Sequence, residues 1–129
     1  MIDPKVAVIA HCSASSAIVA AFANRITPDT IPDGQAYPHA RVRQIGGTQD
    51  YHTTGESQRG HLLQIDVYDD DLIGANANAE IIRAAFSGYM GMMGNMLTGR
   101  VQARITLSNW NETARNFWRV IEVTIPTNN

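Results

Sequence analysis

Residues 44–68 read QIGGTQDYHTTGESQRGHLLQIDVY, and this stretch decides the architecture expected for the chain. Its last eight residues alternate between apolar and polar side chains, which predicts a strand with one buried face and one mixed face. A second strand-like run, residues 40–45, ends at Gly46 and Gly47. Hairpins usually need only about two to five linking residues, so the polar residues 47–59 predict an unusually long loop.

Further along the chain, residues 101–108 and 117–125 alternate in the same way. Residues 3–27 and 71–87 instead repeat apolar side chains every three or four positions, as amphipathic helices do. Asp3-Pro4 suits a helix start, and we expect that helix to end before Pro28. Asp70 or Asp71 is expected to cap the second helix, and Gly88 to end it.

The resulting order, α-β-β-α-β-β, is typical of an α+β fold. Because each strand has one apolar face, we expect an antiparallel four-stranded sheet with both helices packed on one side. The helix positions expected to face the sheet are Val8, Cys12, Ser15, Val19, Phe22, Ile26, Leu72, Ala75, Ala79, Ile82 and Phe86. Residues 1–129 are the right length for a single domain of this kind.

The composition favours a globular protein with a hydrophobic core and only a weak net electrostatic field. Hydrophobic residues make up 44% of the chain, charged residues 17%, and the formal net charge is −2. Such a charge does not attract DNA or an anionic membrane broadly. A lone cysteine excludes an internal disulfide, and no apolar run is as long as a membrane span, about 18 residues.

Candidate catalytic and metal-binding groups are few. A thiol nucleophile needs a base, but His11 and Cys12 are adjacent on a helix and point in different directions, and Cys12 lies on the expected core stripe. The acidic run at 69–71 lacks calcium-loop spacing and suits a helix start. His39, His52 and His61 are scattered and are expected at the surface. We therefore expect no enzyme, no cofactor and no metal site.

Two other segments lack an assigned role. Arg41 and Arg43 share one face of their strand, and Arg104 lies on a mixed face as well, so the three form a candidate phosphate-contacting set or simply a solvated sheet face. The Gly/Met-rich residues 89–99 are too glycine-broken for a confident helix. They suit a core-edge loop or a pliable binding surface.

An ordered set of motifs over about residues 15–125 resembles the tail completion (tail terminator) proteins of long-tailed bacteriophages and prophages. The matching pieces, in the family's order, are Thr27-Pro28-Asp29, Pro32-Asp33-Gly34, Tyr37-Pro38, Ile45-Gly46-Gly47, Tyr51, Gln64-Ile65-Asp66-Val67-Tyr68, residues 79–85 and residues 117–123. Residues 89–99 have no counterpart in the family's pattern.

This resemblance implies a structural virion protein that forms a ring, as a hexamer, on the end of the tail tube. The ring would stop tube polymerisation and present a docking face to the head connector, after assembly in the host cytoplasm. DNA would pass through without specific binding. The long loop would contact a neighbouring copy or the tube through Asp50, Tyr51, His52, Glu56 and Arg59, while Arg41, Arg43 and Arg104 would line the lumen. Alternatives are a head–tail joining (neck) protein, or a small ligand- or peptide-binding module.

Overall fold

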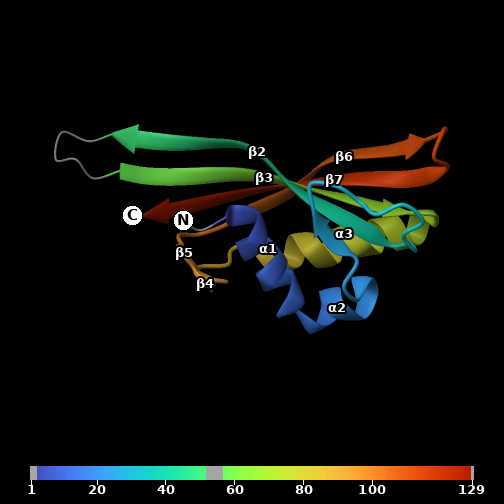
Figure 1. Ribbon diagram of the computed structural model, residues 1–129, viewed down its shortest axis with the longest axis horizontal. Helices are drawn as coiled ribbons and strands as arrows, with labels where there is room; N and C mark the ends of the chain where they lie inside the picture. Colours follow the sequence, from blue (N-terminus) through green and yellow to red (C-terminus); the bar gives the residue numbers. More distant parts are fainter. Residues whose placement is uncertain (1–2, 52–56, 129) are drawn as a thin grey trace.

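The computed structural model describes residues 3–51 and 57–128, with side chains for residues 3–46 and 60–126 (Figure 1). Within these residues, the helices all lie on one face of a long sheet. The elements in chain order are α1 Pro4–Ser13, α2 Ser16–Phe22, β1 Ile26–Pro28, β2 His39–Tyr51, β3 Ser57–Asp69, α3 Leu72–Phe86, β4 Gly91–Met93, β5 Met96–Thr98, β6 Gln102–Asn111 and β7 Asn116–Asn128.

The α+β class is confirmed, whereas the expected sheet was too simple. The four expected strands are present as β2, β3, β6 and β7, all antiparallel to their neighbours. However, β1 adds a parallel strand beside β2, so the sheet is mixed. The β4–β5 hairpin joins β7 through one pair, Thr98 with Thr127. It lies on the edge of β7 that does not pair with β3, and β6 pairs with another part of the same edge.

The extra strand β1 occupies the place where the first helix was expected to end, before Pro28. Backbone hydrogen bonds fix it: Ala40 N–H donates to Arg25 O at 3.0 Å, and Asp29 N–H donates to Val42 O at 2.9 Å. Pro28 has no N–H to donate, which is tolerated because β1 lies at the edge of the sheet. Ile26 is buried and anchors the strand in the core.

The single helix expected over residues 3–27 is in fact two helices, bent by 92° with respect to each other. Asp3 caps α1 as expected, but the chain leaves the helix at Ser13. Ser15 then caps α2, with its hydroxyl accepting from Ile18 N–H at 3.4 Å. Serine side chains offer the backbone such local bonds and so favour helix ends over helix interiors, which explains the break.

The core lies between the helices and one face of the sheet. Val8, Cys12, Phe22 and Ile26 are buried, as are four of the five positions expected on the second helix, Ala75, Ala79, Ile82 and Phe86. Three expected positions are not buried: Val19 and Leu72 are 43% and 48% exposed, and Ser15 is half-buried as the cap of α2. Met93 and Met96 also join the core, so the unassigned Gly/Met segment is a hairpin that buries one of its faces.

The polar loop expected at residues 47–59 is mostly strand. Pairing of β2 with β3 continues to Tyr51 opposite Ser57, so both strands run well past the helix layer (Figure 1). We call these paired ends, residues 47–51 and 57–59, the arm. The register shifts between Gln44 and Gly46, which makes Ile45 the extra residue of a β-bulge at the base of the arm.

Gly74 in the first turn of α3 is expected to resist replacement. A Cβ atom there would stand 2.7 Å from Oδ2 of Asp69, and that carboxylate is held by Asn78 Nδ2 at 3.0 Å and by Asp71 N–H at 3.3 Å. Gly→Ala in a helix is normally worth about 1 kcal/mol of stabilisation. We predict that Gly74→Ala instead lowers the free energy of unfolding, measured by denaturant titration.

The matched control reverses the exchange at an exposed position of the same helix. Ala77→Gly should lower the free energy of unfolding by about 1 kcal/mol, because helix propensity alone acts there. A gain from Gly74→Ala as large as the loss from Ala77→Gly would contradict the clash.

Candidate assembly surface

The helix-free face of the sheet is organised around the buried carboxylate of Asp66 on β3. Its Oδ2 accepts from Arg41 Nε at 2.8 Å and from Arg43 Nε at 2.9 Å, both on β2. Its Oδ1 accepts from Gln64 Nε2 at 2.7 Å and from Trp118 Nε1 of β7 at 3.2 Å. A buried charge is tolerated only when it is paired and hydrogen-bonded, and four donors from three strands meet that requirement.

The strand register brings the three predicted arginines to this one face. Arg43 lies opposite Gln64, Gln64 opposite Glu122, and Glu122 opposite Arg104, so these residues form one row across four strands. Arg104 is exposed at the β6 edge of the sheet. Arg41 and Arg43 are less free, since they share one carboxylate and are 29% and 35% exposed.

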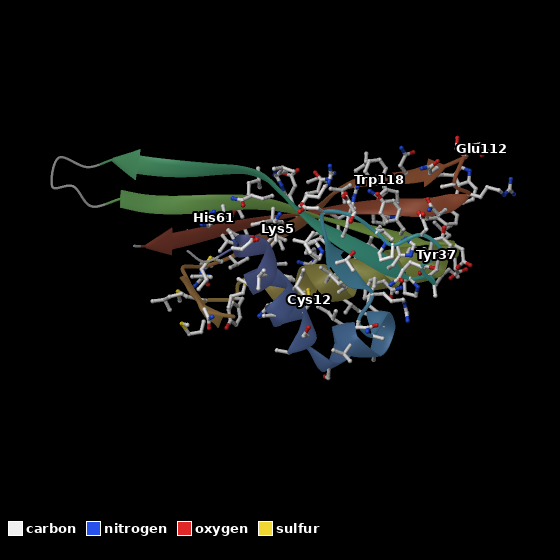
Figure 2. All side chains as sticks on the ribbon, viewed as in Figure 1. Lys5, Cys12, Tyr37, His61, Glu112 and Trp118 are labelled. Atoms are coloured by element: carbon white, nitrogen blue, oxygen red, sulfur yellow. The ribbon has the colours of Figure 1, made fainter. Side chains whose placement is uncertain are left out.

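An aromatic row crosses the same face beyond the arginines. Tyr37 stacks on His39 at 4.9 Å between ring centroids, His39 approaches Tyr68 at 5.6 Å, and Tyr68 is stacked with Trp118 at 6.2 Å. Burial, followed by the nearby charge of Asp66, raises the pKa of Tyr68. Figure 2 shows Tyr37 and Trp118 towards the end of the molecule opposite the arm. This row was not predicted, although positions 39, 68 and 118 all fall on the mixed strand faces.

The prediction that the histidines lie at the surface was wrong for His39. His39 is only 8% exposed, because it lies within the aromatic row and its Nδ1 bonds Ala36 O at 3.1 Å. His61, at the opposite end, lies 3.2 Å from the side-chain amide of Gln44. Neither histidine belongs to a group of three or more His, Cys, Asp or Glu side chains among the described residues, so the described part offers no metal centre.

The contact residues predicted for the polar loop divide into two sets. Asp50, Tyr51 and Arg59 occupy strand positions in the arm, so they extend a paired ribbon and do not belong to a loop. His52 and Glu56 lie outside the described residues. The arm itself has no helix beneath it in Figure 1, and β7 pairs with its β3 side as far as Gln58 opposite Asn128.

The cysteine and the acidic run have structural positions. Cys12 is 2% exposed within the helix layer, and burial raises the pKa of its thiol to about 12, so it is not poised as a nucleophile (Figure 2). Neighbouring His11 points elsewhere, with Nε2 2.9 Å from Ala85 O and its ring against Phe86 and Tyr89. The carboxylate of Asp71 caps α3 by accepting from Gly74 N–H at 2.7 Å.

Within residues 3–51 and 57–128, no single helix combines the length and apolar character of a span, and the pair α1–α2 reaches that length only across its sharp bend.

Asp66 should contribute more to stability than any other charged group on this face. We predict that Asp66→Asn lowers the free energy of unfolding by about 2–3 kcal/mol, because two arginines lose their shared carboxylate. The matched control is Arg104→Gln, at an exposed position of the same face, which should change stability by less than about 0.5 kcal/mol. Urea titration measures both. A loss for Asp66→Asn no larger than for the control would show that the network is dispensable.

The fold is similar to that of a chain in a solved virion structure, and the sequence matches a protein-family model. A chain in the solved structure "Virion of native gene transfer agent (GTA) particle" has the same fold, with a TM-score of 0.74 at 16% sequence identity, over 97% of this chain and 94% of that chain. No curated protein sequence matches. The family model described as "Tail completion protein gp17" matches residues 6–92, more than half of the sequence. The chain therefore belongs to the tail completion protein gp17 family, as the motif resemblance had indicated, and is a phage tail structural protein.

Proposed function

We propose that the protein caps the end of the tail tube as a homo-oligomeric ring, stops tube polymerisation and presents a docking face to the head connector. The observation that carries this proposal is the family match, because a tail completion protein must act where the tube ends. The molecule is also built for contacts in more than one direction. A ribbon of paired strands leaves the body at one end, and no helix of the described part of the chain covers the second face of the sheet.

The arm is the element we assign to contact with a neighbouring copy or with the tube. Its strands extend past the helices in Figure 1, so the paired ribbon projects from the body of the molecule. Rings require each subunit to reach the next through two different surfaces, and a projecting ribbon supplies such reach. Tyr51 is proposed as the anchor, with Asp50, His52, Glu56 and Arg59 around it, because aromatic and arginine side chains dominate contact energies.

The helix-free face is proposed to line the channel of the ring. Arg41 and Arg43 share the carboxylate of Asp66, and Arg104 stands in a row with Glu122, so three guanidinium groups are set against two carboxylates. A surface of this kind carries guanidinium groups near DNA without a strong uncompensated field. DNA would therefore pass along it without being held, which suits a conduit through which a genome must later leave.

Removing the arm tests the proposed function directly. Thr48 pairs with Gly60, so a two-residue Asn-Gly turn can replace residues 49–59 and close the hairpin at that pair. We predict an unchanged melting temperature, since every residue of the described core cluster is retained, together with overlong tubes in electron micrographs.

Tyr51→Ser removes the proposed anchor side chain but keeps the full length of the arm. We expect this variant to fold and to assemble at least about tenfold more weakly. Normal tail lengths and normal joining with the shortened arm would exclude the proposed contact. Tubes of normal length that fail only to join heads would favour the neck-protein alternative over a terminator.

The channel proposal predicts weak binding to DNA. Duplex binding measured between low and moderate salt should have a log–log slope shallower than about −3, since at most three arginines contact phosphate. Arg104→Gln should reduce that slope by about one, because Arg104 is the arginine of the three without an ion pair among the described residues. Tight binding with a steeper salt dependence would contradict a passive channel.

A further inference from the structure

The helix layer has two exposed apolar patches that the core does not use. The first, which we call the hairpin patch, consists of Met90, Met92 and Leu97, which are 63%, 56% and 62% exposed. Met92 and Leu97 are register partners on the outer side of the β4–β5 hairpin, opposite the buried pair Met93 and Met96. This hairpin thus has an apolar side chain on both faces, and only one face is covered by its own chain.

The second patch is at the start of α3, where Leu72 and Ile73 are 48% and 78% exposed. They directly follow Asp70 and Asp71, both exposed, so this corner combines two apolar side chains with two carboxylates. We call it the helix corner. Helix starts need capping, which explains Asp71, but capping explains neither Asp70 nor the two large exposed apolar residues.

Charge at the two patches is complementary. A cavity of about 470 Å³ opens between the end of α3 and the start of β6, and Gly88 and Arg100, which flank the hairpin segment in the chain, are among its lining residues. Arg104 and Glu122 line it as well, so the lining holds two guanidinium groups and one carboxylate, and the described residues give Arg100 no ion-pair partner. The hairpin patch is therefore apolar with a basic hollow, whereas the helix corner is apolar with an acidic edge.

The chain connects the hollow tightly to the hairpin patch. Gly88 N–H donates to Val101 O, and Val101 N–H donates to Tyr89 O, each at 2.8 Å. The segments before and after the β4–β5 hairpin are thus hydrogen-bonded to each other at its base. By contrast, α3 runs along the helix layer, so its first turn lies towards the end of the molecule opposite the hairpin (Figure 1).

We propose that these patches are the two halves of one contact between copies: the helix corner of one subunit packs on the hairpin patch of the next, with Asp70 directed towards Arg100. This inference rests on the proposed ring. Two different, complementary patches at opposite ends of a molecule form a head-to-tail contact, which can close into a ring, whereas a self-complementary patch would give only a dimer. The apolar side chains supply buried area, and the charges select the partner surface.

Cross-linking on the protein and on assembled tails tests this contact. A chain carrying both Ile73→Cys and Leu97→Cys is treated with a short bismaleimide. Cys12 remains in place because it is buried and its raised thiol pKa keeps it unreactive. We expect a ladder of covalent multimers that ends at the ring size, and no multimers from either single variant.

Charge exchange gives a second readout. Asp70→Lys and Arg100→Glu should each weaken self-association by about tenfold, measured by sedimentation, and the double variant should restore it. Thermal melts check that each variant is folded.

The possible outcomes separate the two proposals. A ring by native mass without a ladder, or a covalent dimer from Leu97→Cys alone, would overturn the patch contact and leave the ring intact. Absence of any oligomer, both in solution and on tails, would overturn the ring and the patch contact with it.

Discussion

The buried carboxylate of Asp66 is the interaction on which the uncovered side of this protein depends. It lies on the strand between β2 and β7 and draws donors from both, so it joins three strands in a place where no hydrophobic layer does so. A one-residue slip of β3 would turn Asp66 into the core and expose Ile65 or Val67 in its place. Register on this face is therefore held by charge as well as by apolar burial.

The two faces of the sheet perform different tasks. The helix side buries the contiguous apolar cluster and provides the stability of the domain. The other side is held together by the Asp66 network, and beyond it this face and the ends of the helix layer present exposed polar, aromatic and apolar groups. A virion component is expected to divide its surface in this way, because contacts reserved for partners must not compete with its own folding.

Much of the main body was predictable from alternation and spacing. Asp66, Arg41 and Trp118 were expected on mixed strand faces, and the first turn of α3 was expected to be capped by an aspartate. What the pattern did not reveal was that Asp66 unites these groups, since cross-strand neighbours depend on register and register depends on the whole sheet. The break at Ser13 was missed because the apolar stripe continues across it, so that periodicity outweighed the serine cluster. The arm was mistaken for a loop because its residues are polar, whereas ladder hydrogen bonds need no apolar side chains.

The bulge at Ile45 separates the projecting end of β2 from its inner part. One unmatched residue shifts the phase of side-chain alternation between the body of β2 and its projecting end. The outer ribbon is thereby decoupled from the pattern that keeps Arg41 and Arg43 beside Asp66. Residues can therefore be added to or removed from the ribbon in pairs on each strand without changing which side chains of the inner sheet surround Asp66.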